Sequence, residues 1–426
     1  MHRDGKEFKS GRVRRPAIVK LLREKSTVSM ARHFFIIVRF VFSSIRISAL
    51  VSSVLFYSCD QKTKSPYSEK SNPTIEIESQ STIHYAVGFD LLTYQNYKIL
   101  HLFRHYNDNA DTLSFVLKEN GAEVASQFKS LIQIHVPLKN MALLHSSYLP
   151  FFSLCETTDH ISAISEAKYV YDKDIYNAVK SGTLSEIGYG ETLDLERLLE
   201  LGISAVVTVG WPNVPNKSQQ VLGELDVPVL IFSDWQETTL LGRLEWVKIV
   251  AALTGANELA DHEFLEIEKR YNTLKSRVID DQNQPDVICN LPYKGSWYMP
   301  GGDSYVSNVI KDAGANYLWS DEEGTGGLQI DFEAVYAKGI AADFWINPGS
   351  ANTFEDIISN DERLKDFQSF KASNVYNSNN RVVRGIANDY WESAIVKPDM
   401  ILADLIKIFH PDFLPDHKLY YYKQIR

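Results

Sequence analysis

Residues 257–277 read NELADHEFLEIEKRYNTLKSR, and this stretch decides the fold. It contains no Gly or Pro, and apolar residues recur along it every three to five positions, from Leu259 to Val278. That spacing predicts a single amphipathic helix of about 20 residues, which spans roughly 30 Å. Two blocks of similar size, residues 81–256 and 281–426, flank the connection at residues 257–280. We therefore expect two lobes joined by one long helix, with a cleft between them.

Both flanking blocks carry short, almost uninterrupted apolar runs that end in Gly, Pro, Ser or Asn. Such runs are typical of strands buried on both faces of a parallel sheet. Helical patterns lie between them, for example Leu193–Leu201, whose leucines form one apolar face. The predicted fold class is α/β, with two Rossmann-like lobes built on parallel sheets. The predicted strands are Met141–His145, Ala205–Val209, Val227–Phe232, Asp286–Asn290 and Asp343–Asn347.

The amino-terminal residues differ in charge from the rest of the chain. Residues 1–58 hold 12 Lys and Arg against 3 Asp and Glu, which leaves 32 basic and 51 acidic residues elsewhere. The uncharged apolar stretch Ile47–Tyr57 follows this basic leader and has the length of a signal-peptide core. The segment resembles a bacterial lipoprotein signal with Cys59 as the lipidated residue, whether translation starts at Met1 or Met30. We expect an exported protein held to a membrane through its lipid anchor, with residues 59–80 as a flexible tether.

Charge and missing motifs exclude several classes of function. Residues 59–426 carry a net charge of −19, which would repel a phosphate backbone, so we expect no nucleic-acid partner. The three cysteines contain no CxxC pair and form neither a disulfide framework nor a zinc site. The sequence has no GxxxxGK[ST], GxSxG or HExxH motif, so we expect neither catalysis nor a cofactor. An enzyme on a two-lobed scaffold and a purely structural or adhesive lipoprotein remain as alternatives.

Aromatic residues follow the predicted strands in both blocks. Ligands of parallel α/β sheets bind just beyond the carboxyl ends of the strands. Large aromatic side chains at those ends offer apolar contact area to a ligand, although each is explained equally well as core of its own lobe. The predicted ligand-binding residues are Ser147, Tyr148, Trp211, Trp235, Trp297, Tyr298 and Trp391.

An ordered set of segments resembles a known family. The segments are LDLERLLELG at 193–202, GELDVPV at 223–229, GRLEWVK at 242–248, WYMPGG at 297–302, DAGA at 312–315 and KPDMILADLI at 397–406. In this order, over residues 81–426, they are similar to the substrate-binding proteins of ABC transporters for iron–siderophore complexes, haem and cobalamin. The resemblance implies a monomeric periplasmic protein that captures such a chelate. It implies delivery of the chelate to an inner-membrane permease with its ATPase.

The resemblance also implies a role for two acidic residues. From spacing alone, Glu196 and Glu333 are solvated surface side chains. In the family, one surface Glu of each lobe docks onto Arg residues of the permease, and these two residues match those positions. Each carboxylate can accept two hydrogen bonds from one Arg guanidinium. Because the two carboxylates lie on different lobes, both can bind their arginines only when the lobes are a particular distance apart.

Two readings of the ligand stay open. Arg clusters suited to anionic ferric catecholates are missing from the predicted binding loops, since Arg381 and Arg384 are the nearest basic pair. An aromatic cleft with few cations favours a hydroxamate siderophore, cobalamin or haem. The alternative is a lipoprotein that binds a transition-metal ion directly, through His84, His145 or His160 with carboxylates.

Overall fold

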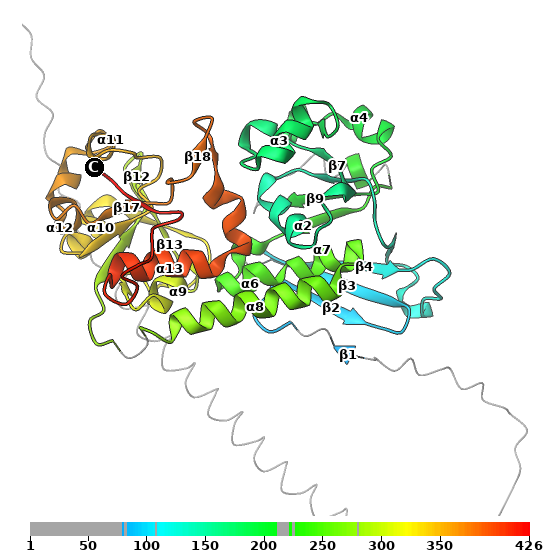
Figure 1. The fold of residues 1–426 in the computed structure, drawn as a ribbon, viewed down its shortest axis with the longest axis horizontal. Coiled ribbons are helices and arrows are strands. Elements are labelled where there is room, and N and C mark those ends of the chain that lie inside the picture. The colour runs from blue at the N-terminus through cyan, green and yellow to red at the C-terminus, as the bar shows by residue number, and fades with distance from the viewer. Residues whose placement is uncertain (1–78, 81–82, 107–108, 211–220, 224–225, 279–280) are drawn as a thin grey trace, which may run out of the picture. The chain divides into compact units, whose positions relative to one another are not determined.

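The computed structural model describes residues 79–80, 83–106, 109–210, 221–223, 226–278 and 281–426 (Figure 1). The predicted signal peptide, Cys59, nearly all of the predicted tether and Trp211 lie outside these residues. The chain divides into two compact units, and every described residue belongs to the unit Pro73–Arg426. Within the described part, every helix is too short or too polar to cross a membrane.

The first lobe is built on a five-stranded sheet with the order β10-β9-β6-β7-β8. All its neighbouring strands are parallel, as the apolar runs predict. The strands are β6 (Met141–Leu143), β7 (Ile161–Ile164), β8 (Ser185–Glu186), β9 (Ala205–Val209) and β10 (Val229–Phe232). Its helices include α2 (Leu149–Leu154), α3 (Lys173–Lys180), α4 (Leu195–Glu200), α6 (Leu240–Glu245) and α7 (Val247–Thr254).

The second lobe is built on a five-stranded sheet with the order β14-β11-β16-β17-β20. Its strands are parallel except β20, which closes one edge in the antiparallel sense. They are β11 (Asp286–Cys289), β14 (Asn316–Tyr317), β16 (Phe344–Ile346), β17 (Val375–Asn377) and β20 (Lys423–Gln424). Smaller sheets pair β12 (Pro292–Tyr293), β13 (Ser296–Pro300) and β15 (Gly327–Asp331), and β18 (Val382–Val383) with β19 (Ala387–Asn388). Its helices include α9 (Tyr305–Asp312), α10 (Phe332–Gly339), α11 (Phe354–Ile358), α12 (Gln368–Lys371) and α13 (Pro398–Phe409).

A third five-stranded sheet precedes the first lobe, where the sequence predicts only parallel layers. Strands β1 to β4 are antiparallel, and β5 joins β4 in parallel. Residues 97–103 are interpretable as a strand from the sequence, and β3 confirms it, but Lys98 and His101 interrupt the continuous apolar run that marks a strand of a buried parallel sheet. The strands are β1 (Ser79–Gln80), β2 (Phe89–Thr93), β3 (Tyr97–Tyr106), β4 (Asn109–Lys118) and β5 (Ile132–His135).

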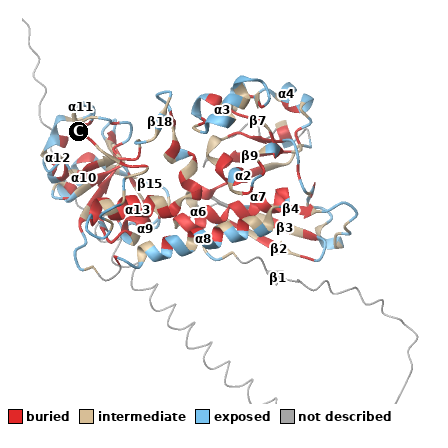
Figure 2. Cartoon of the chain, in the orientation of Figure 1, coloured by how far each residue is buried: buried red, intermediate tan, exposed pale blue. Residues whose placement is uncertain are grey.

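Helix α8 spans Asn257–Lys275, which confirms the predicted long helix and ends it two residues before Arg277. Its buried residues are Ala260, Phe264, Ile267 and Tyr271, which lie on one face at helical spacing, while much of the opposite face is exposed (Figure 2). The helix packs against α7 of the first lobe and against α13 of the second (Figure 1). The exact division of the chain into domains at residues 256 and 281 stays a prediction.

Two buried carboxylates fasten the segment that leads into β2 to the first lobe. The Glu245 carboxylate, which is fully buried, accepts backbone N–H groups from residues 84–86 at 2.8–3.1 Å. The Glu237 carboxylate accepts the N–H groups of Val87 and Gly88 and the Trp246 indole N–H. A Cβ atom on Gly88 would lie 2.7 Å from the Trp246 ring, so this close approach requires glycine.

We expect Glu245→Ala to lower the free energy of unfolding by about 3 kcal/mol. The backbone N–H groups of residues 84–86 lose their acceptor, and the buried Lys248 ammonium loses the carboxylate that lies 2.8 Å away. Chemical denaturation monitored by circular dichroism measures the change. Glu258→Ala is the matched control, since Glu258 is an exposed residue in the first turn of α8. Equal stability of the two variants would contradict the anchoring role.

Candidate ligand-binding cavity

A cavity of about 640 Å³ opens at the carboxyl ends of the first lobe's parallel strands. Residues 144–148 follow β6, Ser165 and Glu166 follow β7, and Asp234 and Trp235 lie beyond β10. These side chains meet because the carboxyl ends of parallel strands share one edge of the sheet. That edge is where open α/β sheets bind their ligands.

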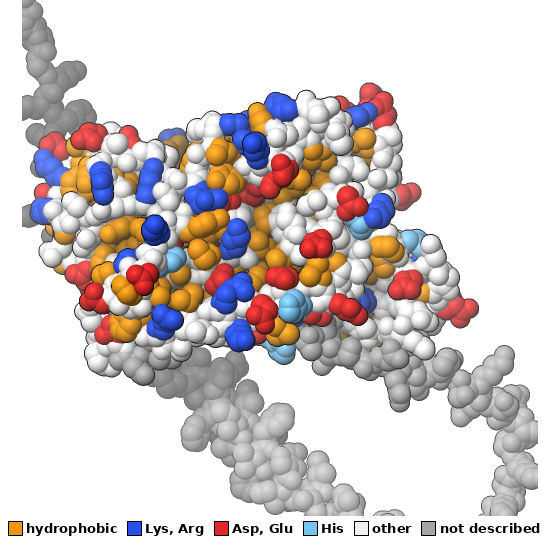
Figure 3. All heavy atoms as spheres, viewed as in Figure 1, with side chains coloured by type: hydrophobic (Ala, Val, Ile, Leu, Met, Phe, Trp, Pro, Cys, Tyr) orange, Lys and Arg blue, Asp and Glu red, His pale blue; other side chains and the backbone are white. Residues whose placement is uncertain are grey.

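The second lobe supplies the facing side of the cavity. Its lining residues come from the start of α9, from the β18–β19 hairpin and from the two 3-10 turns that follow the hairpin. They are Tyr305, Ile386, Asn388, Tyr390, Trp391 and Ile395. The predicted cleft between the lobes is therefore present, and Figure 3 shows hydrophobic side chains gathered on the face between α3 and α13.

The charges in this cavity compensate one another. The Arg243 guanidinium donates to the Asp234 carboxylate at 2.8 Å, and both side chains are largely buried. Arg243 also lies 4.4 Å from the centre of the Tyr305 ring, so the pair connects the two lobes. Glu166 is paired with Lys168 at 2.7 Å. Among the described lining residues Arg243 is the single Lys or Arg, and the cavity therefore has no excess of positive charge.

His145 brings a neutral nitrogen donor to the cavity. Its Nδ1 lies 2.6 Å from the Ser147 hydroxyl oxygen and accepts the Ser147 backbone N–H at 3.4 Å. Burial lowers the pKa of His145 below its usual value, and the nearby Asp234 carboxylate only partly opposes that shift. The imidazole is therefore neutral at pH 7.

Four of the predicted ligand-binding residues line the cavity: Ser147, Tyr148, Trp235 and Trp391. The Tyr148 side chain is fully buried, and its ring packs against Phe232. The Trp235 indole N–H donates to the Gly210 carbonyl oxygen at 2.9 Å, which fixes its ring at the end of β9. Trp391 remains 61% exposed, so a bound molecule has a large apolar surface to cover there. Their contact with a ligand stays a prediction.

The position of Trp297 is corrected by the structure. Its side chain is fully buried, its indole N–H donates to the Cys289 carbonyl oxygen at 2.8 Å, and its ring packs on Trp345. Strand β13 turns alternate residues to opposite faces, so Trp297 points into the core and Tyr298 is 45% exposed. Neither residue lines the cavity.

Several lining residues were not predicted from the sequence. Tyr169 and Tyr189 follow β7 and β8, which are only four and two residues long and leave little pattern in the sequence. Recognising those two strands would have placed both tyrosines at the same sheet edge as Ser147. Arg243 lies within α6 and Tyr305 begins α9, so neither follows the end of a strand.

The two predicted docking residues both lie at helix amino termini. Glu196 is exposed in the first turn of α4, and Glu333 is exposed in the first turn of α10. The Arg363 guanidinium donates to Glu333 at 2.8 Å and is itself held by Asp361. Their docking role stays a prediction.

The three histidines of the alternative hypothesis, direct binding of a transition-metal ion, lie in different environments. His84 is exposed beside β2, His145 lines the cavity, and His160 is buried next to Lys139 and Asp159. Within the described part of the chain, no group of three or more His, Cys, Asp or Glu side chains is placed to hold a metal ion.

Comparison with known proteins identifies the family. Residues 142–382, more than half of the chain, match the family model described as periplasmic binding protein. The chain belongs to the periplasmic binding protein family. The matched residues contain the first lobe's sheet and run through the core of the second lobe.

The chain is also similar to a relative of undetermined role and to solved structures of the same fold. An uncharacterized lipoprotein of Methanocaldococcus jannaschii is 26% identical over 90% of this chain and 98% of its own length. A periplasmic haem-binding protein of Pseudomonas aeruginosa superposes with a TM-score of 0.51 at 15% identity, over 68% of this chain and 98% of that one. A periplasmic haem-binding protein of Roseiflexus sp. RS-1 superposes with a TM-score of 0.50 at 16% identity, over 65% of this chain and 99% of that one. These structures show the two-lobed fold.

The lowered pKa of His145 predicts a pH dependence of stability. The unfolded chain takes up a proton at this residue near its ordinary pKa, above the pKa in the folded state. The stability contributed by neutral His145 is therefore present above about pH 6.5 and is lost as the pH falls. We expect the stability of the native protein to fall more steeply between pH 7 and pH 5 than that of His145→Gln. Denaturation curves at both pH values measure the difference, and parallel losses in the two proteins would contradict it.

Proposed function

We propose that this protein captures an iron complex, or a similarly large chelate such as haem or cobalamin, and delivers it to the permease of an ABC importer. The observation that carries the proposal is the cavity between the lobes, which both lobes line and to which both contribute Tyr and Trp side chains. The chain binds and hands over its ligand without catalysis. The transport energy comes from the ATPase of the importer.

The size and lining of the cavity support a bulky ligand. Its volume of about 640 Å³ lies within the range of cavities that enclose cofactor-sized molecules. Tyr169, Trp391 and Ile386 are all exposed at this cavity, and they would be covered by an apolar, planar ligand. The two haem-binding proteins of the same fold make haem a natural candidate.

The charge of the cavity favours a near-neutral ligand over an anionic catecholate complex. Arg243 is held by Asp234, so binding a strongly anionic complex would require breaking that buried pair. Neutral His145 and the tyrosine hydroxyls supply nitrogen and oxygen donors of the kinds that bind iron in haem proteins.

The amino-terminal sequence supports export and attachment to a membrane. Cys59 follows a signal-like apolar stretch, and relatives in Methanocaldococcus jannaschii are described as lipoproteins. The periplasmic setting is proposed from the family, whose model is described as periplasmic binding protein. Lipid attachment at Cys59 would keep the protein near the permease.

Intrinsic fluorescence tests the ligand. The chain has seven tryptophans, and Trp391 is 61% exposed at the cavity. We expect haem, ferric hydroxamate or cobalamin to quench the fluorescence saturably, and Trp391→Phe to remove part of that quenching. Trp297→Phe is the matched control, because its ring lies in the core away from the cavity.

Two results would contradict the proposed ligand class. Tight binding of a ferric catecholate alone would refute the argument from charge. A response to bare metal ions, abolished by His145→Ala and absent with every chelate, would favour the direct metal-ion reading.

The docking assignment predicts a defect in uptake without a defect in binding. We expect Glu196→Arg combined with Glu333→Arg to bind the chelate with unchanged affinity, because neither residue lines the cavity. Cells carrying this variant should take up the chelate at least about tenfold more slowly, since each reversed charge repels a permease arginine. The matched control is Glu355→Arg, an exposed residue in the first turn of α11. Normal uptake by the double variant would overturn the assignment.

A further inference from the structure

A hairpin of the second lobe reaches across to the first lobe. Strands β18 and β19 pair Val382 with Asn388 and Val383 with Ala387. In Figure 1, β18 projects towards α3 of the first lobe. The match to the family model ends at residue 382, so most of this hairpin lies beyond it. The hairpin and the turn after it also supply Ile386, Asn388, Tyr390 and Trp391 to the cavity.

The turn of this hairpin holds an arginine in an unfavourable backbone conformation. Arg384 and Gly385 have φ angles of 54° and 73°, which suit Gly or Asn far better than Arg. The Arg384 guanidinium donates to the Val170 carbonyl oxygen and lies 3.8 Å from the centre of the Tyr176 ring in α3. Arg384, the residue with the unfavourable φ angle, is thus the one that contacts the first lobe. We expect these contacts to offset the cost of its backbone conformation.

A buried carboxylate makes a second, independent contact between the lobes. Glu392 is 4% exposed, and its Oε2 accepts the Tyr171 N–H at 2.7 Å while its Oε1 accepts the Asp172 N–H at 2.8 Å. Both oxygens are therefore committed to backbone groups at the start of α3. Replacement of this side chain leaves two N–H groups without their acceptor.

The turns that follow the hairpin separate two cavities. Tyr390, Trp391 and Ile395 line the ligand cavity, whereas Asp389, Glu392, Ser393 and Val396 line a second cavity of about 530 Å³. Residues 389–393 therefore form a wall between the two cavities, while Ala394, Ile395 and Val396 are buried and their turn packs against α2, α6 and α13.

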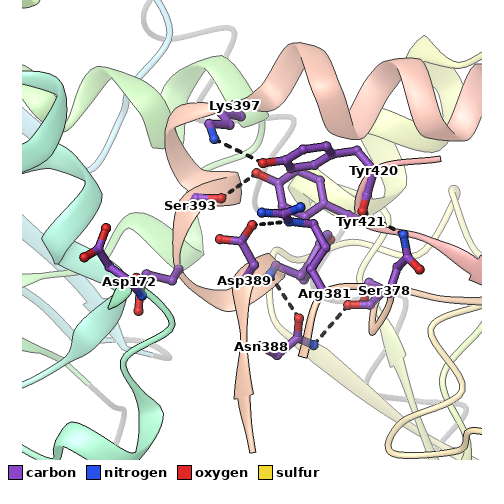
Figure 4. Close-up of polar contacts among 12 residues, drawn as sticks. Asp172, Ser378, Arg381, Asn388, Asp389, Ser393, Lys397, Tyr420 and Tyr421 are labelled. Atoms are coloured by element: carbon purple, nitrogen blue, oxygen red, sulfur yellow. Dashed lines mark hydrogen bonds and ion pairs between the residues drawn. The ribbon is translucent and has the colours of Figure 1, made fainter. Parts of the chain in front are cut away.

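Side-chain bonds fix this wall to the second lobe. The Ser393 hydroxyl lies 2.8 Å from that of Tyr421 (Figure 4). The Arg381 Nε–H donates to Asp389 Oδ2 at 2.6 Å and braces the hairpin segment itself. The Asn388 side-chain amide donates to the Ser378 carbonyl oxygen at 3.0 Å. The hairpin and wall are thus bonded to the second lobe through Asn388 and Ser393, while Arg384 and Glu392 carry direct hydrogen bonds to the first lobe.

We infer that residues 381–392 form a clasp, which moves with the second lobe and retains the ligand by attaching to residues 170–176 of the first lobe. The inference rests on the proposed function, because it gives that ligand cavity its closing element. Arg384 and Glu392 are positioning residues, since neither lines the ligand cavity. Their effect on the ligand passes through the clasp.

Amide hydrogen exchange on the ligand-free full chain tests the clasp directly. We expect Arg384→Asn to speed exchange at the Tyr171 and Asp172 amides about tenfold, because the clasp detaches more often without the Arg384 contacts. Glu392, whose carboxylate accepts both of these N–H groups, is unchanged in this variant. Asn tolerates the positive φ angle, so this variant should unfold at the same temperature as the native protein or higher. Arg426→Ala, at the exposed last residue of the chain, is the control and should leave both amides unchanged.

Ligand release is the second readout, with haem as the probe. We expect haem to dissociate about tenfold faster from Arg384→Asn and from Glu392→Ala than from the native protein. If Glu392→Ala fails to fold, Arg384→Asn decides the question. Exchange and dissociation rates in Arg384→Asn within about twofold of the native values would overturn the clasp. If the native protein binds none of the chelates, the proposed function fails, whereas the exchange experiment still judges the attachment of the clasp.

Discussion

The spacing of the two lobes depends on α8, because its two ends are bonded to different parts of the molecule. At its amino-terminal end, Lys98 of β3 donates to Asn257 at 2.8 Å. At its carboxyl-terminal end, Arg270 donates to Asp399 of α13 at 2.7 Å, and the Tyr271 hydroxyl donates to Asp312 of α9 at 2.8 Å. A helix cannot change its length without breaking its own hydrogen bonds, so these contacts hold the lobes at a set distance.

Because α8 fixes the distance between the lobes on its own side, the lobes can change their angle more easily than their separation. In Figure 1, α8 runs along one side of the lobes and β18 lies on the other. With the α8 side held, a change in lobe angle is largest at the far side, where the contacts of Arg384 and Glu392 lie. The hydrogen bonds of Arg384 and Glu392 at that edge therefore have the largest effect on the width of the ligand cavity. Helix α8 thus sets the distance between the lobes, and the proposed clasp holds their angle.

The sequence predicts the two lobes well because buried parallel strands and a helix without Gly or Pro leave strong local patterns. It predicts the cavity less well because burial of a given side chain depends on strands far apart in the chain. Trp297 and Trp391 show the difference: both were assigned to the cavity, yet Trp297 fills the core and Trp391 lines the cavity. The hairpin at 382–388 consists of two two-residue strands, too short for any periodicity to reveal.

The surface chemistry of Glu333 fits a docking role better than its ion pair first suggests. Its partner Arg363 is an exposed side chain that Asp361 also holds, so Arg363 keeps a carboxylate when Glu333 turns to another arginine. An exposed pair contributes at most about 1 kcal/mol, so exchange of one arginine for another costs little. Glu196 and Glu333 lie on different lobes, and their separation follows the lobe angle. On the proposed function, a permease that engages both carboxylates therefore responds to the lobe angle that the clasp holds.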